Sequence, residues 1–171
     1  IVEYIHEHPK AKAKTMFAAA FKKHKYEGKY FYCYCTKSSH FSFVVEEALK
    51  SEIHLETSYA YDIEIIKKLY AKKKITKDIH IICNGFKQKP YTRRIANLLN
   101  AGFHNVIPVL DNKEELKDYA TSVKVPFKLG IRVAAEEEPN FPFYTSRLGM
   151  RAKDILEFYV DRIEGYESKF Q

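Results

Sequence analysis

The stretch Tyr30-Phe31-Tyr32-Cys33-Tyr34-Cys35-Thr36-Lys37-Ser38-Ser39-His40 decides how the rest of the chain is interpreted. Its first six residues are aromatic or carry thiols, and such a short run is typical of a buried strand. The run stops at Lys37, and residues 41–49 then show the apolar and acidic spacing of a helix. Lys37 is therefore predicted to lie where a strand passes into a helix. In parallel α/β structures, functional sites are built from the loops that connect the carboxyl end of each strand to the following helix.

Strand and helix patterns alternate along the rest of the chain. The further strands are predicted at residues 53–56, 79–83, 106–110 and 127–133. Helices are predicted at residues 11–25, 41–50, 62–74, 113–121 and 150–163, and another runs from Pro90 to a stop at Gly102. Asp111 and Asn112 are expected to cap the helix at 113–121. Residues 134–145 are expected to form a long loop.

This alternation predicts an α/β fold with a parallel sheet and helical crossovers, because strand starts recur about every 25 residues. Periodicity alone is compatible with an open doubly wound sheet and with part of a closed barrel. No glycine-rich phosphate turn follows the first strand, which weighs against a dinucleotide-binding domain.

Composition indicates one globular domain. The 171 residues are 46% hydrophobic, and no apolar run is long enough to cross a membrane. No signal-peptide pattern opens the chain, and three cysteines without paired spacing indicate a reducing, cytoplasmic compartment.

The net charge of +7 leaves a basic nucleic-acid-binding domain as an alternative function. Much of the excess lies in two clusters, Lys22-Lys23-His24-Lys25 and Lys72-Lys73-Lys74. Both clusters come directly after helical patterns and are therefore expected at helix C-termini. Cations at a helix C-terminus offset the negative end of the helix dipole. Because zinc spacings and nucleic-acid fold signatures are absent from the sequence, we interpret the charge as helix-end charge and expect no nucleic-acid partner.

Five segments carry a family resemblance. They are Tyr34-Cys35-Thr36-Lys37, Leu55-Glu56-Thr57-Ser58, Ile82-Cys83-Asn84-Gly85-Phe86-Lys87, Leu129-Gly130-Ile131-Arg132 and Ser146-Arg147-Leu148-Gly149. In this order they resemble the motifs of pyridoxal-phosphate-dependent basic amino acid decarboxylases, whose barrels are of the alanine racemase type. The bacterial biosynthetic arginine decarboxylases are the most similar branch.

The resemblance implies a fold and a domain division. Residues 29–171 would supply the first five strands of a TIM-type (βα)8 barrel that binds pyridoxal 5'-phosphate, and residues 1–28 would be a leading helical segment. A complete barrel takes about 250 residues, so the chain is expected to be a fragment. The resemblance also implies a homodimer or higher homo-oligomer.

The resemblance assigns roles to three residues. Lys37 matches the family's Schiff-base lysine, Glu56 an acidic residue near the cofactor, and Arg132 the arginine that approaches the pyridoxal ring oxygen. A solvated lysine and a helix-capping carboxylate are the alternatives for Lys37 and Glu56. A buried arginine needs a charged or polar partner, which favours a ligand-facing Arg132. Cys33 and Cys35 share a strand face, but no further ligand set completes a metal site.

The implied activity is decarboxylation of arginine or a related basic amino acid in polyamine biosynthesis. A sister branch acts on diaminopimelate or carboxynorspermidine, and a decarboxylase-like regulator without chemistry is a further alternative. Ser38 and Ser39 depart from the Val-Asn or Cys-Asn that usually follows the family's lysine. The family's phosphate cradle, the acidic partner of the pyridine nitrogen and the second β domain are not recognisable before Gln171. The isolated chain is therefore expected to be catalytically inactive.

Overall fold

The computed structural model describes residues 9–134, 149–164 and 170. Its elements in chain order are α2 (Pro9–Lys23), β1 (Cys33–Cys35), α3 (Ser42–Leu49), β2 (His54–Thr57), α4 (Ala60–Ala71), β3 (Ile81–Cys83), α5 (Lys89–Asn100), β4 (Val106–Leu110), α6 (Glu115–Ser122), β5 (Gly130–Ile131), α7 (Ala152–Phe158) and the π-helix η1 (Tyr159–Ile163). The five strands form one parallel sheet, so the predicted α/β fold is confirmed.

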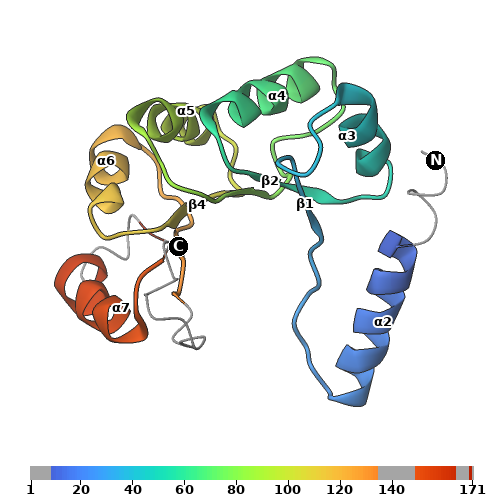
Figure 1. Cartoon of the computed structure of the whole chain (residues 1–171), viewed down its shortest axis with the longest axis horizontal. Coiled ribbons are helices and arrows are strands. Elements are labelled where there is room, and N and C mark those ends of the chain that lie inside the picture. The colour runs from blue at the N-terminus through green and yellow to red at the C-terminus, as the bar shows by residue number, and fades with distance from the viewer. Residues whose placement is uncertain (1–8, 135–148, 165–169, 171) are drawn as a thin grey trace, which may run out of the picture.

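The sheet is wound in one direction. Its strand order is β1-β2-β3-β4-β5, so each strand pairs with the next one in the sequence. A doubly wound sheet reverses its strand order at one point, and this sheet has no reversal. In Figure 1 the helices α3, α4, α5 and α6 form an arc along one side of the strands. Of the two arrangements that the periodicity allowed, the described residues follow the singly wound one.

The core lies between the sheet and this arc of helices. Side chains alternate along each strand, and the helix-facing residues Leu55, Ile81 and Val106 are paired in register and fully buried. They pack in one cluster with Ile63 of α4 and Ile95 of α5. Burying each such side chain contributes about 1.5–3 kcal/mol, so this face stabilises the fold.

The opposite face of the sheet is covered less completely. Glu56, Ile82 and Ile107 are in register on this face, and all three are only partly buried. Among the described residues no second helical layer packs on it, as Figure 1 shows. The polar side chains that follow the strands are therefore accessible from this side.

The fifth strand is shorter than predicted. Residues 127–133 were expected to be extended, but β5 covers only Gly130 and Ile131. Phe127 and Val133 instead form isolated bridges with Phe170 and Met150. Pairing with distant parts of the chain therefore limits the length of β5.

The C-terminal helix also differs from its prediction, because residues 150–163 divide into α7 and η1. The predicted loop at residues 134–145 lies outside the described residues except for Ala134.

The lysine clusters lie at helix ends, as predicted. Lys22 and Lys23 are in the last turn of α2, and Lys72 follows the last residue of α4. The ammonium groups of Lys72 and Lys74 lie 3.1 and 3.2 Å from the carboxylate of Glu46. Part of the basic charge is therefore compensated within the protein. None of the helices in the described ranges is both long and apolar enough to cross a membrane.

Candidate functional site

Lys37 lies in a tight turn between β1 and α3, as predicted. The carbonyl of Cys35 accepts hydrogen bonds from the backbone N–H of Ser38 (3.2 Å) and from its hydroxyl (2.7 Å). Thr36 is fully buried, and its N–H and hydroxyl both donate to the carbonyl of Glu56 (3.0 and 3.1 Å). These bonds fix the backbone on either side of Lys37. The Lys37 side chain is exposed and makes no hydrogen bond or ion pair with any described residue.

Glu56 is oriented by the neighbouring strand. Its carboxylate accepts a hydrogen bond of 3.1 Å from the side-chain amide of Asn84, which follows β3. The capping of α4 depends on Asp62 instead, because its carboxylate accepts the backbone N–H groups of Ser58 and Tyr59 (2.8 and 3.1 Å). The alternative role of Glu56 as a helix cap is therefore wrong.

Arg132 lies directly after β5 and is tied to β4 through its backbone. Its N–H donates to the carbonyl of Leu110 at 2.9 Å. Its guanidinium Nη1 lies 3.7 Å from Oδ1 of Asp111, and 37% of the side chain is exposed. Arg132 thus has a buried acidic partner on one side and access to solvent on the other.

All three residues line one cavity of about 480 Å³ at the carboxyl ends of the strands. The other lining residues are Cys35, Ser58, Tyr59, Ala60, Asn84, Gly85, Phe86, Gln88, Pro90 and Tyr91. Gly85 has a φ of +80°, and a Cβ added there would lie 3.0 Å from the carbonyl oxygen of Ser58. The wall of the cavity is therefore closely packed where β2 and β3 end.

A buried charged cluster adjoins Arg132, and sequence reasoning missed it. Lys87 is fully buried, and its ammonium lies 3.5 Å from Oε2 of Glu115 and donates to the carbonyls of Gly85 and Val109. The N–H of Asp111 donates to the same Glu115 oxygen (3.2 Å). Burial raises the pKa of the Glu115 carboxyl, while the Lys87 ammonium opposes this shift.

The capping prediction for this segment is half wrong. Asn112 accepts the backbone N–H of Glu115 at 3.1 Å and so caps α6. The carboxylate of Asp111 does not cap, because both of its oxygens are buried and make no hydrogen bond within the described part of the chain. A charged residue placed directly after the apolar run 106–110 was the available signal in the sequence.

Two cysteine thiols near the strand ends, Cys33 and Cys83, are poor nucleophiles. Burial raises the pKa of Cys83 to about 11, and burial, followed by the charge of Glu56, raises the pKa of Cys33. A thiolate is the reactive form of cysteine, so both shifts suppress reaction. Within the described residues, no three His, Cys, Asp or Glu side chains form a group that could hold a metal ion.

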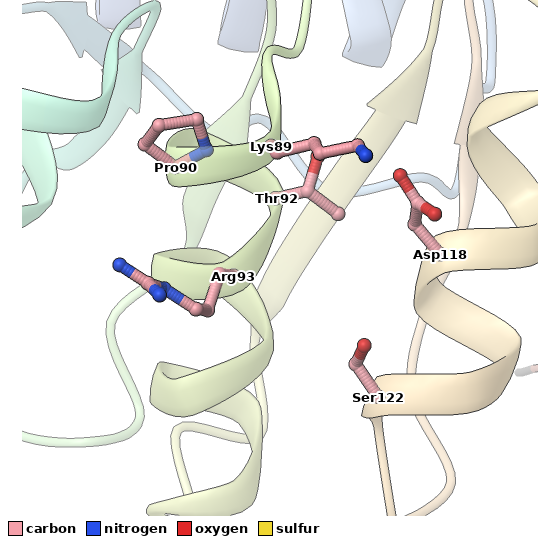
Figure 2. A pocket seen from close by; sticks show the side chains of 6 residues that line it. All are labelled: Lys89, Pro90, Thr92, Arg93, Asp118 and Ser122. Atoms are coloured by element: carbon pink, nitrogen blue, oxygen red, sulfur yellow. The ribbon is translucent and has the colours of Figure 1, made fainter.

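A second hollow, of about 350 Å³, lies within the helical layer. It is lined by Lys89, Pro90, Thr92, Arg93, Asp118 and Ser122. Figure 2 shows Lys89 at the start of α5 and Asp118 of α6 extending toward each other across it. Its residues come from the helices and not from the strand ends, but Pro90 also lines the cavity that contains Lys37, so the two hollows adjoin at this residue.

These observations define a parallel α/β protein that gathers an amine, a carboxylate and a guanidinium at the carboxyl edge of its sheet. No protein-family model matches the chain. Over 125 residues it is 34% identical to the biosynthetic arginine decarboxylase of Shewanella piezotolerans. The alignment covers 68% of the chain and 19% of that protein, so the chain spans about a fifth of its relative. The similarity to this decarboxylase is thus distant and partial.

Proposed function

We propose that the chain forms the cofactor-lysine part of a pyridoxal-phosphate-dependent decarboxylase for arginine or a related basic amino acid. The observation that carries the proposal is the shared cavity of Lys37, Glu56 and Arg132 at the carboxyl ends of the strands. Sites of parallel βα structures are built at this edge. A cavity of this volume is in the usual range for a small-molecule ligand.

The residues present fit this cofactor by the chemistry of their side chains. Lys37 offers a primary amine that is not engaged by any described residue, which an aldehyde requires. Arg132 offers a cationic set of N–H donors for an oxygen anion such as that of the pyridoxal ring. Asn84 holds the carboxylate of Glu56 beside them.

Each of these side chains has a distinct task in the proposed reaction. When bound, pyridoxal phosphate would accept the electron pair left on the substrate as carbon dioxide departs. Lys37 would hold the cofactor, because its side chain is the primary amine with which an aldehyde combines. Arg132 would keep the ring oxygen ionised, and Glu56 would place a negative charge near the cofactor.

We further propose that the sheet is part of a closed (βα)8 barrel. The one-directional strand order and the partly covered inner face support this, since a barrel packs its helices outside and its strands around a common interior. Residues 29–171 would then belong to the barrel and residues 1–28 to a leading segment. We place the phosphate site and the acidic partner of the ring nitrogen in the part of such a protein that the chain does not span. The enzyme would be a cytoplasmic homo-oligomer.

Borohydride labelling tests this proposal in the complete protein that contains residues 1–171. With pyridoxal phosphate present, reduction should leave a pyridoxyl group on Lys37, which peptide mass spectrometry would locate. Lys89→Ala is a matched control, because Lys89 is an exposed lysine outside the cavity. Labelling of another lysine with Lys37 unmodified would refute the assignment.

A substrate panel would then test the specificity. We expect faster release of carbon dioxide from arginine than from ornithine, lysine or diaminopimelate. A clear preference for diaminopimelate or carboxynorspermidine would move the protein to the sister branch.

A further inference from the structure

Asp111 is a buried carboxylate that nothing in the proposed reaction has yet explained. Only 5% of the residue is exposed, and neither carboxylate oxygen has a hydrogen-bond partner in the described ranges. Burying an ionised carboxylate is unfavourable unless a cation compensates it. The guanidinium of Arg132, with Nη1 3.7 Å from Oδ1, supplies this charge.

The backbone of Asp111 is held in place by Glu115 and Lys87. Its N–H donates to Glu115, whose carboxylate in turn lies 3.5 Å from the buried ammonium of Lys87. The same ammonium donates to the carbonyl of Val109, near the end of β4. Because these groups fix the end of β4, Asp111 has little freedom to move, and the longer side chain of Arg132 must adapt to it.

We propose that Asp111 is a positioning residue that holds the guanidinium of Arg132 toward the cavity. A guanidinium carries five N–H donors in a planar fork, and the contact with Asp111 engages it at Nη1. The remaining donors are left for an oxygen anion in the cavity that Arg132 shares with Lys37. The binding of an oxygen anion by these donors rests on the proposed function, whereas the ion pair between Asp111 and Arg132 does not.

The first test measures pyridoxal phosphate binding by absorbance titration of the complete protein. Asp111→Asn keeps the size of the side chain and removes its charge, and we expect it to weaken binding about tenfold, which corresponds to losing one charge-assisted contact between Arg132 and the cofactor. In an Arg132→Met background the same substitution should have no further effect. An equal loss in both backgrounds would mean that Asp111 acts only on the fold, and would overturn the proposal. Asp118→Asn, on the exposed side of α6, is the matched control.

The second test needs no cofactor. Phenylglyoxal modifies arginine side chains, and a neighbouring carboxylate suppresses this reaction by stabilising the charged guanidinium. Asp111→Asn should raise the labelling rate of Arg132 several-fold and leave that of the exposed Arg93 unchanged. An unchanged rate at Arg132 would overturn the proposal. If the wild-type protein bound no pyridoxal phosphate, the proposed function would fail, and this labelling would still decide the role of Asp111.

A third measurement does not need the single variant Asp111→Asn to fold. Arg132→Met should lower the urea midpoint of unfolding, because it leaves a buried carboxylate without a cation. The double variant Arg132→Met/Asp111→Asn should regain much of this loss, since the unpaired charge is then removed. If Arg132→Met left the midpoint unchanged, the two side chains would not be coupled and the proposal would be wrong.

Discussion

The two ends of the sheet carry different kinds of side chain. At the carboxyl end, Lys37, Glu56 and Arg132 surround a cavity that is open to solvent. At the amino end of β2 and β3, the rings of His54 and His80 lie 4.5 Å apart, centre to centre. A parallel sheet thus separates stability from activity. Packed rings fill its amino end, whereas charged groups stay accessible at its carboxyl end.

The amino end is closed by packing and by one hydrogen bond. Phe31 lies against both imidazoles, with ring centres 5.3 Å from His54 and 4.6 Å from His80. The backbone N–H of His80 donates to Nδ1 of His54 at 3.2 Å, which requires His54 to be neutral. Nearby, the ammonium of Lys128 donates to the side-chain oxygen of Asn105 at 2.7 Å. The comparison therefore predicts that substitutions at the carboxyl end alter activity, whereas those at the amino end alter stability without altering activity.

The largest effect is expected at Lys37. In the complete protein, Lys37→Ala should reduce decarboxylation at least about a thousandfold, because it removes the amine that would hold the cofactor. The urea midpoint should stay within experimental error, since the side chain is exposed and has no partner among the residues described. Carbon dioxide release and urea unfolding measure the two quantities, and Lys50→Ala is the control at an exposed lysine of the same αβ unit. Retained turnover, or a large loss of stability, would contradict this separation of tasks.

A smaller effect is expected from two glycines, one near each end of the sheet. Gly85 and Gly102 both have positive φ, +80° and +87°, so alanine is strained at either position by about 1–2 kcal/mol. A Cβ at Gly85 would also lie 3.0 Å from the carbonyl oxygen of Ser58, whereas at Gly102 its nearest neighbour is the flexible end of Lys77 at 3.7 Å.

Urea unfolding should therefore show a larger loss for Gly85→Ala than for Gly102→Ala. Only Gly85→Ala should also weaken pyridoxal phosphate binding, because Gly85 lines the cavity. Equal effects of the two variants on stability and on binding would mean that the close contact at Gly85 has no consequence.

The regular part of this architecture could be predicted from local sequence. The strand Val106–Leu110 was predicted at its observed bounds, because a short run rich in β-branched residues between turn residues favours a strand. The position of Lys37 followed from the abrupt change from aromatic to polar residues. The direction of winding did not follow, because periodicity carries no information on which strands become neighbours.

The errors occur where tertiary contacts override local preference. The length of β5 was overestimated because Phe127 and Val133 pair with Phe170 and Met150. Asp111 was interpreted as a helix cap because aspartate at this position commonly is one. Its burial depends on Arg132, which follows the next strand, so no local pattern could reveal it.

The smallest effect is expected at the amino end and depends on pH. Burial lowers the pKa of His54, and burial, then His54 and then Lys128 lower the pKa of His80. Both imidazoles therefore bind fewer protons in the folded than in the unfolded state, where the pKa is about 6.5. Their contribution to stability is complete above that pH and is lost as the pH falls through the lower pKa of the folded state.

His80→Phe should make this loss of stability between about pH 7 and about pH 5 less steep. The substitution removes one titrating group, keeps a ring beside Phe31, and keeps the backbone N–H that donates to His54. Urea midpoints across this range measure the slope, and His104→Phe, at an exposed histidine, is the control. Decarboxylation at neutral pH should be unaffected in both variants, because neither residue lines the cavity. A pH slope unchanged by His80→Phe would show that the rings close this end of the sheet by packing alone.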